Sequence, residues 1–295
     1  MQNRQYGLGV LLVLIGGLFL SGNGILLRLV EDADGWQILF YRGAAFSMTL
    51  LVILLGKYRD RTVSAFRDIG PRGFYAAIAL GFASCCYVFA LLLTTVANAM
   101  FIIGAAPLAT ALCAWLLLNE RISKAGIITM FVALGGVSLL FADGFSSGGT
   151  MGNLAALGVV AGFVVYLLIV RDSRDVDMLP ATCLSGIVMV VVGFIGAEHL
   201  SLQANDLIIA LVMGCVLITV GFGCYTIAAR YILAAEVALF ALAESILAPI
   251  WVWIGVDEAP SKVTLIGCTI VVVAVAVYSI VEITKESRRV DVVTD

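Results

Sequence analysis

Two charged side chains lie inside long apolar segments of this sequence, and they are the residues best suited to do chemistry there. Arg42 falls several residues into the segment 36–56, and Glu244 falls well inside the segment 234–256. A charge in hydrocarbon costs about 3 kcal/mol or more, so both side chains should face protein or water. Arg42 could hold a carboxylate through two parallel hydrogen bonds. Glu244 could exchange a proton or hold a substrate ammonium group.

Each of these two residues also has a structural alternative. Arg42 is only about two turns from the end of its segment, so its head group could reach the surface and pair with Asp32 or Asp34. Glu244 could be a protonated side chain that is hydrogen-bonded to a neighbouring helix. The sequence leaves both alternatives open.

The segments that carry these charges identify the class of protein. The chain has 295 residues, of which 62% are hydrophobic and 13% charged, whereas a soluble chain usually carries about 25% charged residues. The apolar runs are about 20 residues long and unbroken, which is typical of membrane-spanning helices rather than alternating barrel strands. We therefore predict an all-α integral membrane protein with ten transmembrane helices, at 6–29, 36–56, 73–94, 96–118, 124–142, 152–171, 178–197, 206–229, 234–256 and 263–283.

The basic residues of the loops indicate the orientation of these helices. Loops on the cytoplasmic side of a membrane carry an excess of Lys and Arg. With the N-terminus inside, the inner loops hold every Lys and Arg of the chain except Lys262, which falls outside, and Arg28 and Arg42, which lie within spans. This partition predicts ten spans with both termini in the cytoplasm.

The sequence also repeats itself at a spacing of 138 residues. Each half holds five predicted spans, an odd number, so the second half must insert upside down relative to the first. We predict one five-helix repeat at 1–145, an inverted repeat at 150–284, and a cytoplasmic tail at 285–295. Inverted repeats usually enclose a binding site near the middle of the membrane. The matched pairs include Tyr87 and Tyr225, Trp115 and Trp253, Glu120 and Glu258, Ser123 and Ser261, and Lys124 and Lys262.

Breaks in the helical pattern supply further candidates. Asn23 lies in a Ser-Gly-Asn-Gly stretch that interrupts the first span, where it could donate to a substrate or simply permit close helix packing. Pro107 and Pro249 fall inside the fourth and ninth spans. Each could act as a hinge between two states or impose a static kink.

Aromatic residues could form the walls of the central cavity. The repeat would place Tyr87 and Tyr225 on either side of it, and aromatic surfaces there would accept apolar or aromatic solutes. Each aromatic residue could instead pack in the core or face lipid. The candidate substrate-binding residues are therefore Asn23, Tyr41, Arg42, Tyr87, Phe101, Tyr166, Tyr225, Phe240, Glu244 and Trp251, with Pro107 and Pro249 as candidate hinges.

Several classes of function lack their sequence signals. The only histidine is His199, and no Cys-x-x-Cys pair, His-Glu-x-x-His motif or Gly-x-x-x-x-Gly-Lys motif occurs. The net charge of −3 offers no basic face for nucleic acid, and the few membrane charges argue against an ion channel. We expect a protein that is not an enzyme and that needs no metal, cofactor or nucleic acid.

Three stretches resemble the drug/metabolite transporter superfamily, and most closely its EamA-type, YddG-like ten-helix exporters. They are Trp36 with Phe40–Ala45, the core from Gly104 to Glu120, and the core from Leu242 to Glu258. The resemblance implies a secondary transporter in the bacterial cytoplasmic (inner) membrane that exports amino acids, including aromatic or other apolar ones, or related metabolites by alternating access. Its partners would be a small-molecule substrate and the lipid bilayer, and a homodimer is compatible with it. Export of drugs or other metabolites of the same superfamily is the alternative.

Overall fold

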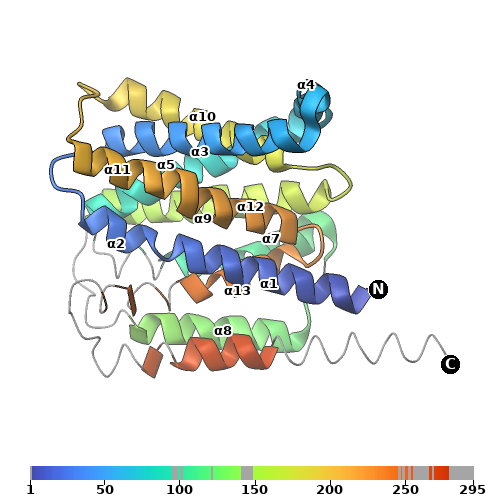
Figure 1. The fold of residues 1–295 in the computed structure, drawn as a ribbon. Coiled ribbons are helices and arrows are strands. Elements are labelled where there is room, and N and C mark those ends of the chain that lie inside the picture. The colour runs from blue at the N-terminus through green and yellow to red at the C-terminus, as the bar shows by residue number, and fades with distance from the viewer. Residues whose placement is uncertain are drawn as a thin grey trace.

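The protein is an all-helical bundle (Figure 1). The computed structural model describes residues 2–94, 99, 102–120, 122–140, 149–244, 247, 250–251, 254, 266–267 and 269–278. Of the described chain 85% is helical, and this part contains no strand, which confirms the predicted all-α class.

Most of the predicted membrane spans correspond to observed helices. Six helical stretches are long and apolar enough to cross a membrane, and three shorter apolar helices lie within other predicted spans. For the remaining predicted span, 234–256, the structure describes α13 (Ala234–Ala241) and a few residues beyond it, so the count of ten stays a prediction. The six long stretches are Gln5–Leu27, Gly35–Asp68, Gly70–Leu93, Thr150–Asp172, Leu179–Gly196 and Ala204–Ala228, and the shorter ones are Ala106–Leu118, Lys124–Gly136 and Thr269–Tyr278.

Helix boundaries follow from local chemistry. Asp34 caps α3, because its carboxylate accepts the N–H of Gln37 at 2.8 Å while the Gln37 side chain accepts the N–H of Asp34 at 2.9 Å. Ser123 accepts the N–H of Gly126 at 3.1 Å at the start of α8, as a capping serine does. The elements are α1 (Gln2–Leu20), α2 (Asn23–Arg28), α3 (Gly35–Tyr58), η1 (Arg59–Arg61), α4 (Thr62–Asp68), α5 (Gly70–Leu93), α7 (Ala106–Leu118), α8 (Lys124–Leu140), α9 (Thr150–Asp172), α10 (Leu179–Gly196), α11 (Ala204–Val212), the π-helical η3 (Met213–Ile218), α12 (Thr219–Ala228) and α13.

Helices from the two halves of the sequence pack against one another throughout the bundle. Helix α10 lies between α3 and α5, α5 also packs on α9, α1 packs on α12 and α13, and α7 packs on α9 and α13. Small residues allow the closest approach. A Cβ on Gly43 would lie 2.8 Å from the carbonyl oxygen of Gly186, and a Cβ on Gly186 would lie 2.8 Å from that of Gly43.

Several of the predicted spans are discontinuous. The first breaks at Ser21–Gly22, where the sequence predicted an interruption. The fourth breaks at a turn over Gly104 and Ala105, and α13 ends in a turn at Leu242. Leu242 follows Gly104 by 138 residues, which is the spacing of the sequence repeat.

The position of Pro107 differs from the expected kink inside a continuous helix. Pro107 lies in the first turn of α7, directly after the break at Gly104 and Ala105. A proline costs nothing there, because the first-turn N–H groups have no helical acceptor. Any hinge near Pro107 would therefore be the preceding turn.

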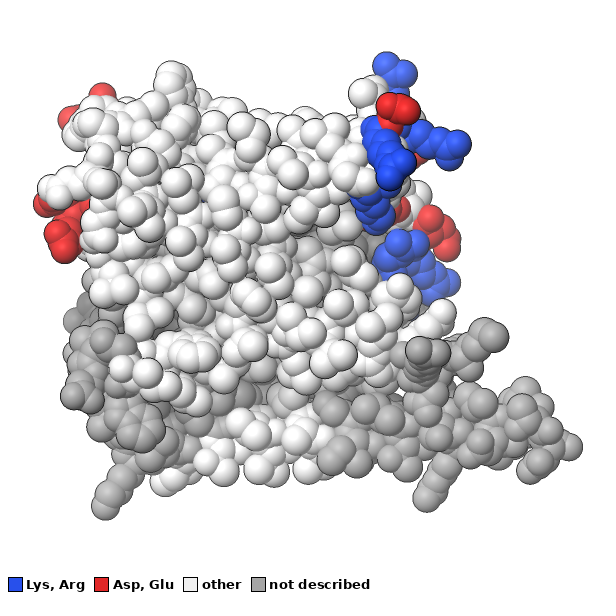
Figure 2. Space-filling model, in the orientation of Figure 1, with Lys and Arg blue, Asp and Glu red and all other residues white. Residues whose placement is uncertain are grey.

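The two ends of the bundle carry different charges (Figure 2). On the face shown, Lys and Arg gather at the end where the N-terminus and α4 lie, and the charged residues visible among the described ones at the opposite end are acidic. At that opposite end, Asp206 accepts the N–H groups of Glu31, Asp32 and Ala33 at 2.9–3.0 Å and so fastens the loop before α3. Hereafter the end with the basic residues is called the basic end.

Candidate functional site

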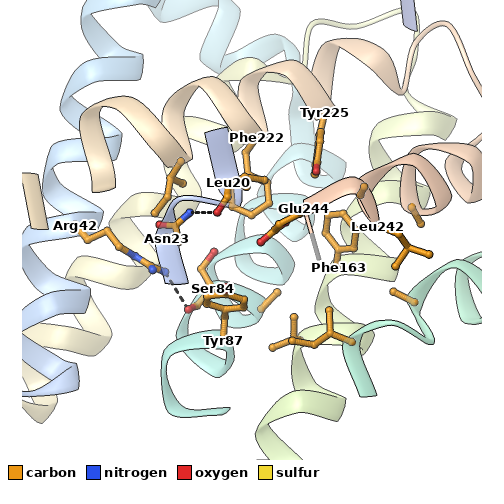
Figure 3. A pocket seen from close by; sticks show the side chains of 17 residues that line it. Leu20, Asn23, Arg42, Ser84, Tyr87, Phe163, Phe222, Tyr225, Leu242 and Glu244 are labelled. Carbon is orange, nitrogen blue, oxygen red and sulfur yellow. Dashed lines mark hydrogen bonds between the residues drawn. The ribbon is translucent and has the colours of Figure 1, made fainter. Parts of the chain in front are cut away.

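A cavity of about 110 Å³ lies inside the bundle, lined by residues from both halves of the sequence (Figure 3). Most of its wall is apolar. Its polar lining comprises Asn23, Arg42, Ser84, Tyr87, Tyr225 and Glu244. The cavity therefore gathers five of the sequence-predicted site residues from α2, α3, α5, α12 and the residues after α13.

Arg42 is buried in this wall, with 2% of its surface exposed. Its Nη2 donates to the carbonyl oxygen of Ser84 at 3.3 Å, and its Nε has no hydrogen-bond partner among the described residues. None of the ion pairs among the described residues includes Arg42. Arg42 therefore does not form the surface ion pair with Asp32 or Asp34 that was the structural alternative.

Asn23 is placed by the break in the first span. It is the first residue of α2 and is 4% exposed. Its Nδ2 donates to the carbonyl oxygen of Leu20 at 2.9 Å, whereas Oδ1 is buried and has no partner in the described part of the chain. A buried acceptor without a donor is costly, so this oxygen is suited to accept a hydrogen bond from a solute.

Glu244 and the two repeat-related tyrosines lie together. Glu244 follows the turn at Leu242 and interacts electrostatically with both Tyr87 and Tyr225. The hydroxyl of Tyr225 is buried and has no hydrogen-bond partner within the residues that the structure describes. Figure 3 shows Arg42 and Glu244 pointing into the same space from different sides, with Tyr87 between them.

Sequence reasoning missed two aromatic residues of the wall. Phe222 and Phe163 line the cavity, and their ring centroids lie 6.2 and 6.3 Å from that of Tyr225. Phe222 is three residues before Tyr225 and so shares its helix face, which is a signal that could have found it. Phe163 reaches the site only through the packing of α9, for which the sequence offers no local signal.

Four of the predicted site residues take other positions and do not line this cavity. Tyr41 donates to the carbonyl oxygen of Leu200 at 2.6 Å, and Trp251 Nε1 donates to Ser21 Oγ at 2.7 Å. Tyr166 is hydrogen-bonded to Thr182 and Thr226. A substrate contact through these residues stays a prediction. Phe240, the fourth, is fully buried with its ring 6.0 Å from that of Tyr278, and Phe101 and Pro249 lie outside the described residues.

The polar groups around the cavity can bind a small solute through hydrogen bonds and charge. Within the described part of the chain, no cluster of three or more His, Cys, Asp or Glu side chains could hold a metal ion. Arg42 supplies hydrogen-bond donors, whereas Glu244 and Asn23 Oδ1 supply acceptors. Long apolar helices around a partly polar central cavity are typical of a multi-pass membrane protein.

Comparisons with known proteins agree with that class. Residues 7–142 match the model of the EamA-like transporter family, which supports the drug/metabolite transporter superfamily and a membrane transporter of small molecules. The chain is similar to a solved protein crystal structure, with a TM-score of 0.80 and 18% sequence identity. The alignment covers 92% of this chain and 98% of the solved one. At that identity it shows the fold alone. No curated protein sequence matches this one.

Proposed function

We propose that this protein is a secondary transporter that exports amino acids, or similar small metabolites, from the bacterial cytoplasm by alternating access. The observation that carries the proposal is the cavity between the two halves, in which Arg42 and Glu244 are both without an ion-pair partner in the described chain. A static protein would gain little from two such charges in a membrane. A carrier gains a site for a charged solute.

The helix packing supports an inverted repeat. If the first helix of each half corresponds, α1 is equivalent to α9, α3 to α10, and α5 to α11–α12. The contact of α1 with α12 then has its equivalent in the contact of α9 with α5. The equivalent helices α3 and α10 pack on each other, as expected around a twofold axis.

The two equivalent turns support a moving site. Gly104 and Leu242 occupy matching positions of the fourth helix in each half, and residues beside both turns line the cavity. Discontinuous helices at a repeat interface are the usual location of substrate sites in such transporters. We infer that these turns, next to Pro107 in the first half, are where the halves bend.

The charge distribution supports an orientation with the basic end in the cytoplasm. At that end, Arg171 Nε donates to Glu120 Oε1 at 2.7 Å, and Arg171 Nη1 donates to the carbonyl oxygen of Ala229 at 3.2 Å. These contacts tie α7, α9 and α12 together. Opening of the cavity toward the cytoplasm requires that this tie be broken.

Transport by reconstituted protein tests the proposal directly. Proteoliposomes loaded with unlabelled amino acid should take up the same radiolabelled amino acid by counterflow, and the uptake should saturate. An absence of counterflow for every amino acid would contradict the amino-acid proposal, and counterflow of a drug or another metabolite instead would favour the alternative substrates. Flux without counterflow stimulation would indicate a channel.

Cysteine labelling tests the inverted repeat. Single cysteines at Ser123 and Ser261, in a background without the native cysteines, should react with membrane-impermeant maleimide from opposite sides. Labelling of both from the same side would contradict the inverted topology, and with it the alternating-access mechanism.

A further inference from the structure

Three of the buried polar atoms that lack a partner in the described chain surround this one cavity. They are Asn23 Oδ1, Arg42 Nε and the hydroxyl of Tyr225. All three side chains are at most 4% exposed. Buried polar groups are almost always satisfied, so this concentration indicates a polar ligand that completes them.

The chemical types of these groups define what the ligand must offer. Arg42 has five N–H donors and no acceptor, so its unpaired donors require an acceptor, preferably a carboxylate. Asn23 Oδ1 and an ionised Glu244 are acceptors, so they require a donor, preferably a cationic one. The Asn23 amide cannot reverse these roles without losing the bond from its Nδ2 to Leu20.

These two requirements meet in one small molecule. Arg42 and Glu244 point into the same cavity from different sides and form no ion pair in the described chain (Figure 3). A compound with a carboxylate and an ammonium group satisfies both at once. The rest of the wall, including Phe163, Phe222 and Leu242, is apolar and leaves no described charge for an ionised side chain.

Building on the proposed function, we propose that the cavity binds one neutral α-amino acid in a fixed orientation. The carboxylate of the amino acid lies on Arg42, its ammonium group lies on Glu244 and Asn23 Oδ1, and its apolar side chain lies against Phe163 and Phe222. Ligands with a single charge leave Arg42 or Glu244 buried and unpaired, and ligands with an extra charge lack a counter-charge. Arg42 and Glu244 therefore select against ligands with one charge and against ligands with an extra charge.

The test is an inhibition matrix on the full-length protein in proteoliposomes. Radiolabelled L-leucine or L-phenylalanine, whichever gives faster counterflow, is competed with the unlabelled amino acid, its carboxamide and its N-acetyl derivative. At about pH 6.5 the carboxamide keeps only the ammonium charge and the N-acetyl derivative keeps only the carboxylate. For the wild type, either loss should raise the inhibition constant about tenfold or more.

Two variants assign the two ends of the ligand. Arg42→Gln should weaken the amino acid about tenfold or more while leaving the carboxamide unchanged, so that these two ligands become equal. Glu244→Gln should weaken the amino acid by a similar factor while leaving the N-acetyl derivative unchanged, so that these two ligands become equal. Lys57→Gln, which removes a cation outside the cavity, should change neither ratio. Arg42→Lys, which keeps the charge, should retain the preference for a carboxylate if Arg42→Gln does not fold.

Three results separate the proposals. Equal inhibition by all three ligands in the wild type would overturn the fixed orientation while leaving amino-acid export intact. Exchanged effects of the two variants would overturn the assignment of the ends. An absence of counterflow with every amino acid would instead defeat the proposed function on which this inference rests.

Discussion

Tyr166 and Tyr225 show how two buried tyrosines on adjacent helices can have opposite energetic roles. Both are at most 1% exposed. The Tyr166 hydroxyl joins α9 to α10 and α12 through Thr182 and Thr226, whereas the Tyr225 hydroxyl has no partner in the described chain. A hydrogen-bonded buried hydroxyl contributes about 1 kcal/mol, and an unsatisfied one costs about 1–3 kcal/mol.

This difference predicts opposite effects of removing the two hydroxyls. Tyr166→Phe should lower the free energy of unfolding by about 1 kcal/mol, because two threonine hydroxyls lose a partner. Tyr225→Phe should leave the stability of the empty protein unchanged or raise it by up to about 1 kcal/mol, and should weaken substrate inhibition. Thermal unfolding in detergent measures both variants. Equal destabilisation would mean that the Tyr225 hydroxyl is satisfied in the empty protein.

Asp177 predicts a pH dependence of stability. Burial disfavours its charged form, but hydrogen bonds from Lys57 at 2.5 Å, Tyr58 at 2.5 Å and the N–H of Leu179 at 3.0 Å outweigh that effect and lower its pKa. Because the folded pKa lies below the unfolded one, this stabilisation is present above about pH 4 and is lost as the pH falls through the folded pKa.

Asp177→Asn should therefore destabilise the protein near neutral pH and reduce its acid sensitivity. The expected effect is below about 1 kcal/mol, because the Lys57 side chain is 47% exposed and solvent screens the pair. Unfolding at about pH 7 and about pH 3 measures the change, with the exposed Asp60→Asn as the control. Identical pH profiles for Asp177→Asn and the wild type would contradict this role.

At the scale of elements, the pairing of α3 with α10 depends on glycine. A Cβ on Gly43 would lie 2.7 Å from the Cβ of Met189 and 2.8 Å from the Gly186 oxygen, and neither atom can move without its backbone. We expect Gly43→Ala to cost about 1–3 kcal/mol through overpacking. Gly56→Ala in the same helix meets nothing within 4 Å and should gain up to about 1 kcal/mol. Denaturant or thermal unfolding in one detergent compares them, and equal effects would mean that α3 and α10 separate readily.

At the scale of the whole molecule, the tie between Arg171 and Glu120 should control which side of the cavity opens. Both side chains are largely buried, at 10% and 18% exposure, so breaking the pair leaves a poorly solvated guanidinium. Glu120→Gln should therefore favour the state that is open to the cytoplasm.

Labelling of a cavity cysteine measures this shift. With Ala238→Cys in a background without native cysteines, Glu120→Gln should speed maleimide labelling from the cytoplasmic side about fivefold or more. Arg72→Gln breaks a pair with Asp172 whose side chains are 68% and 46% exposed, so it should leave the rate unchanged. Equal rates in both variants would assign the closure of the basic end to other contacts, such as those of Glu236 with Tyr6 and Tyr278.

The sequence by itself determined the helical membrane class, most of the helix positions and the two intramembrane charges. It could do so because the bilayer core offers no water to hydrogen-bond the backbone. Long unbroken apolar runs therefore form helices, which satisfy their own backbone N–H and C=O groups. The break before Asn23 is equally local, and the structure contains it. Tyr87 and Tyr225, which are 138 residues apart in the sequence, both line the cavity.

Only the tertiary structure decided which other aromatic side chains line that cavity. Tyr41, Tyr166, Phe240 and Trp251 looked equivalent to the residues that do, yet each has other partners. Phe163 and Phe222 are present instead. The rotation of each helix about its axis selects the face that meets the cavity, and that rotation is set by contacts between distant segments, such as Gly43 on Gly186, which no local pattern encodes.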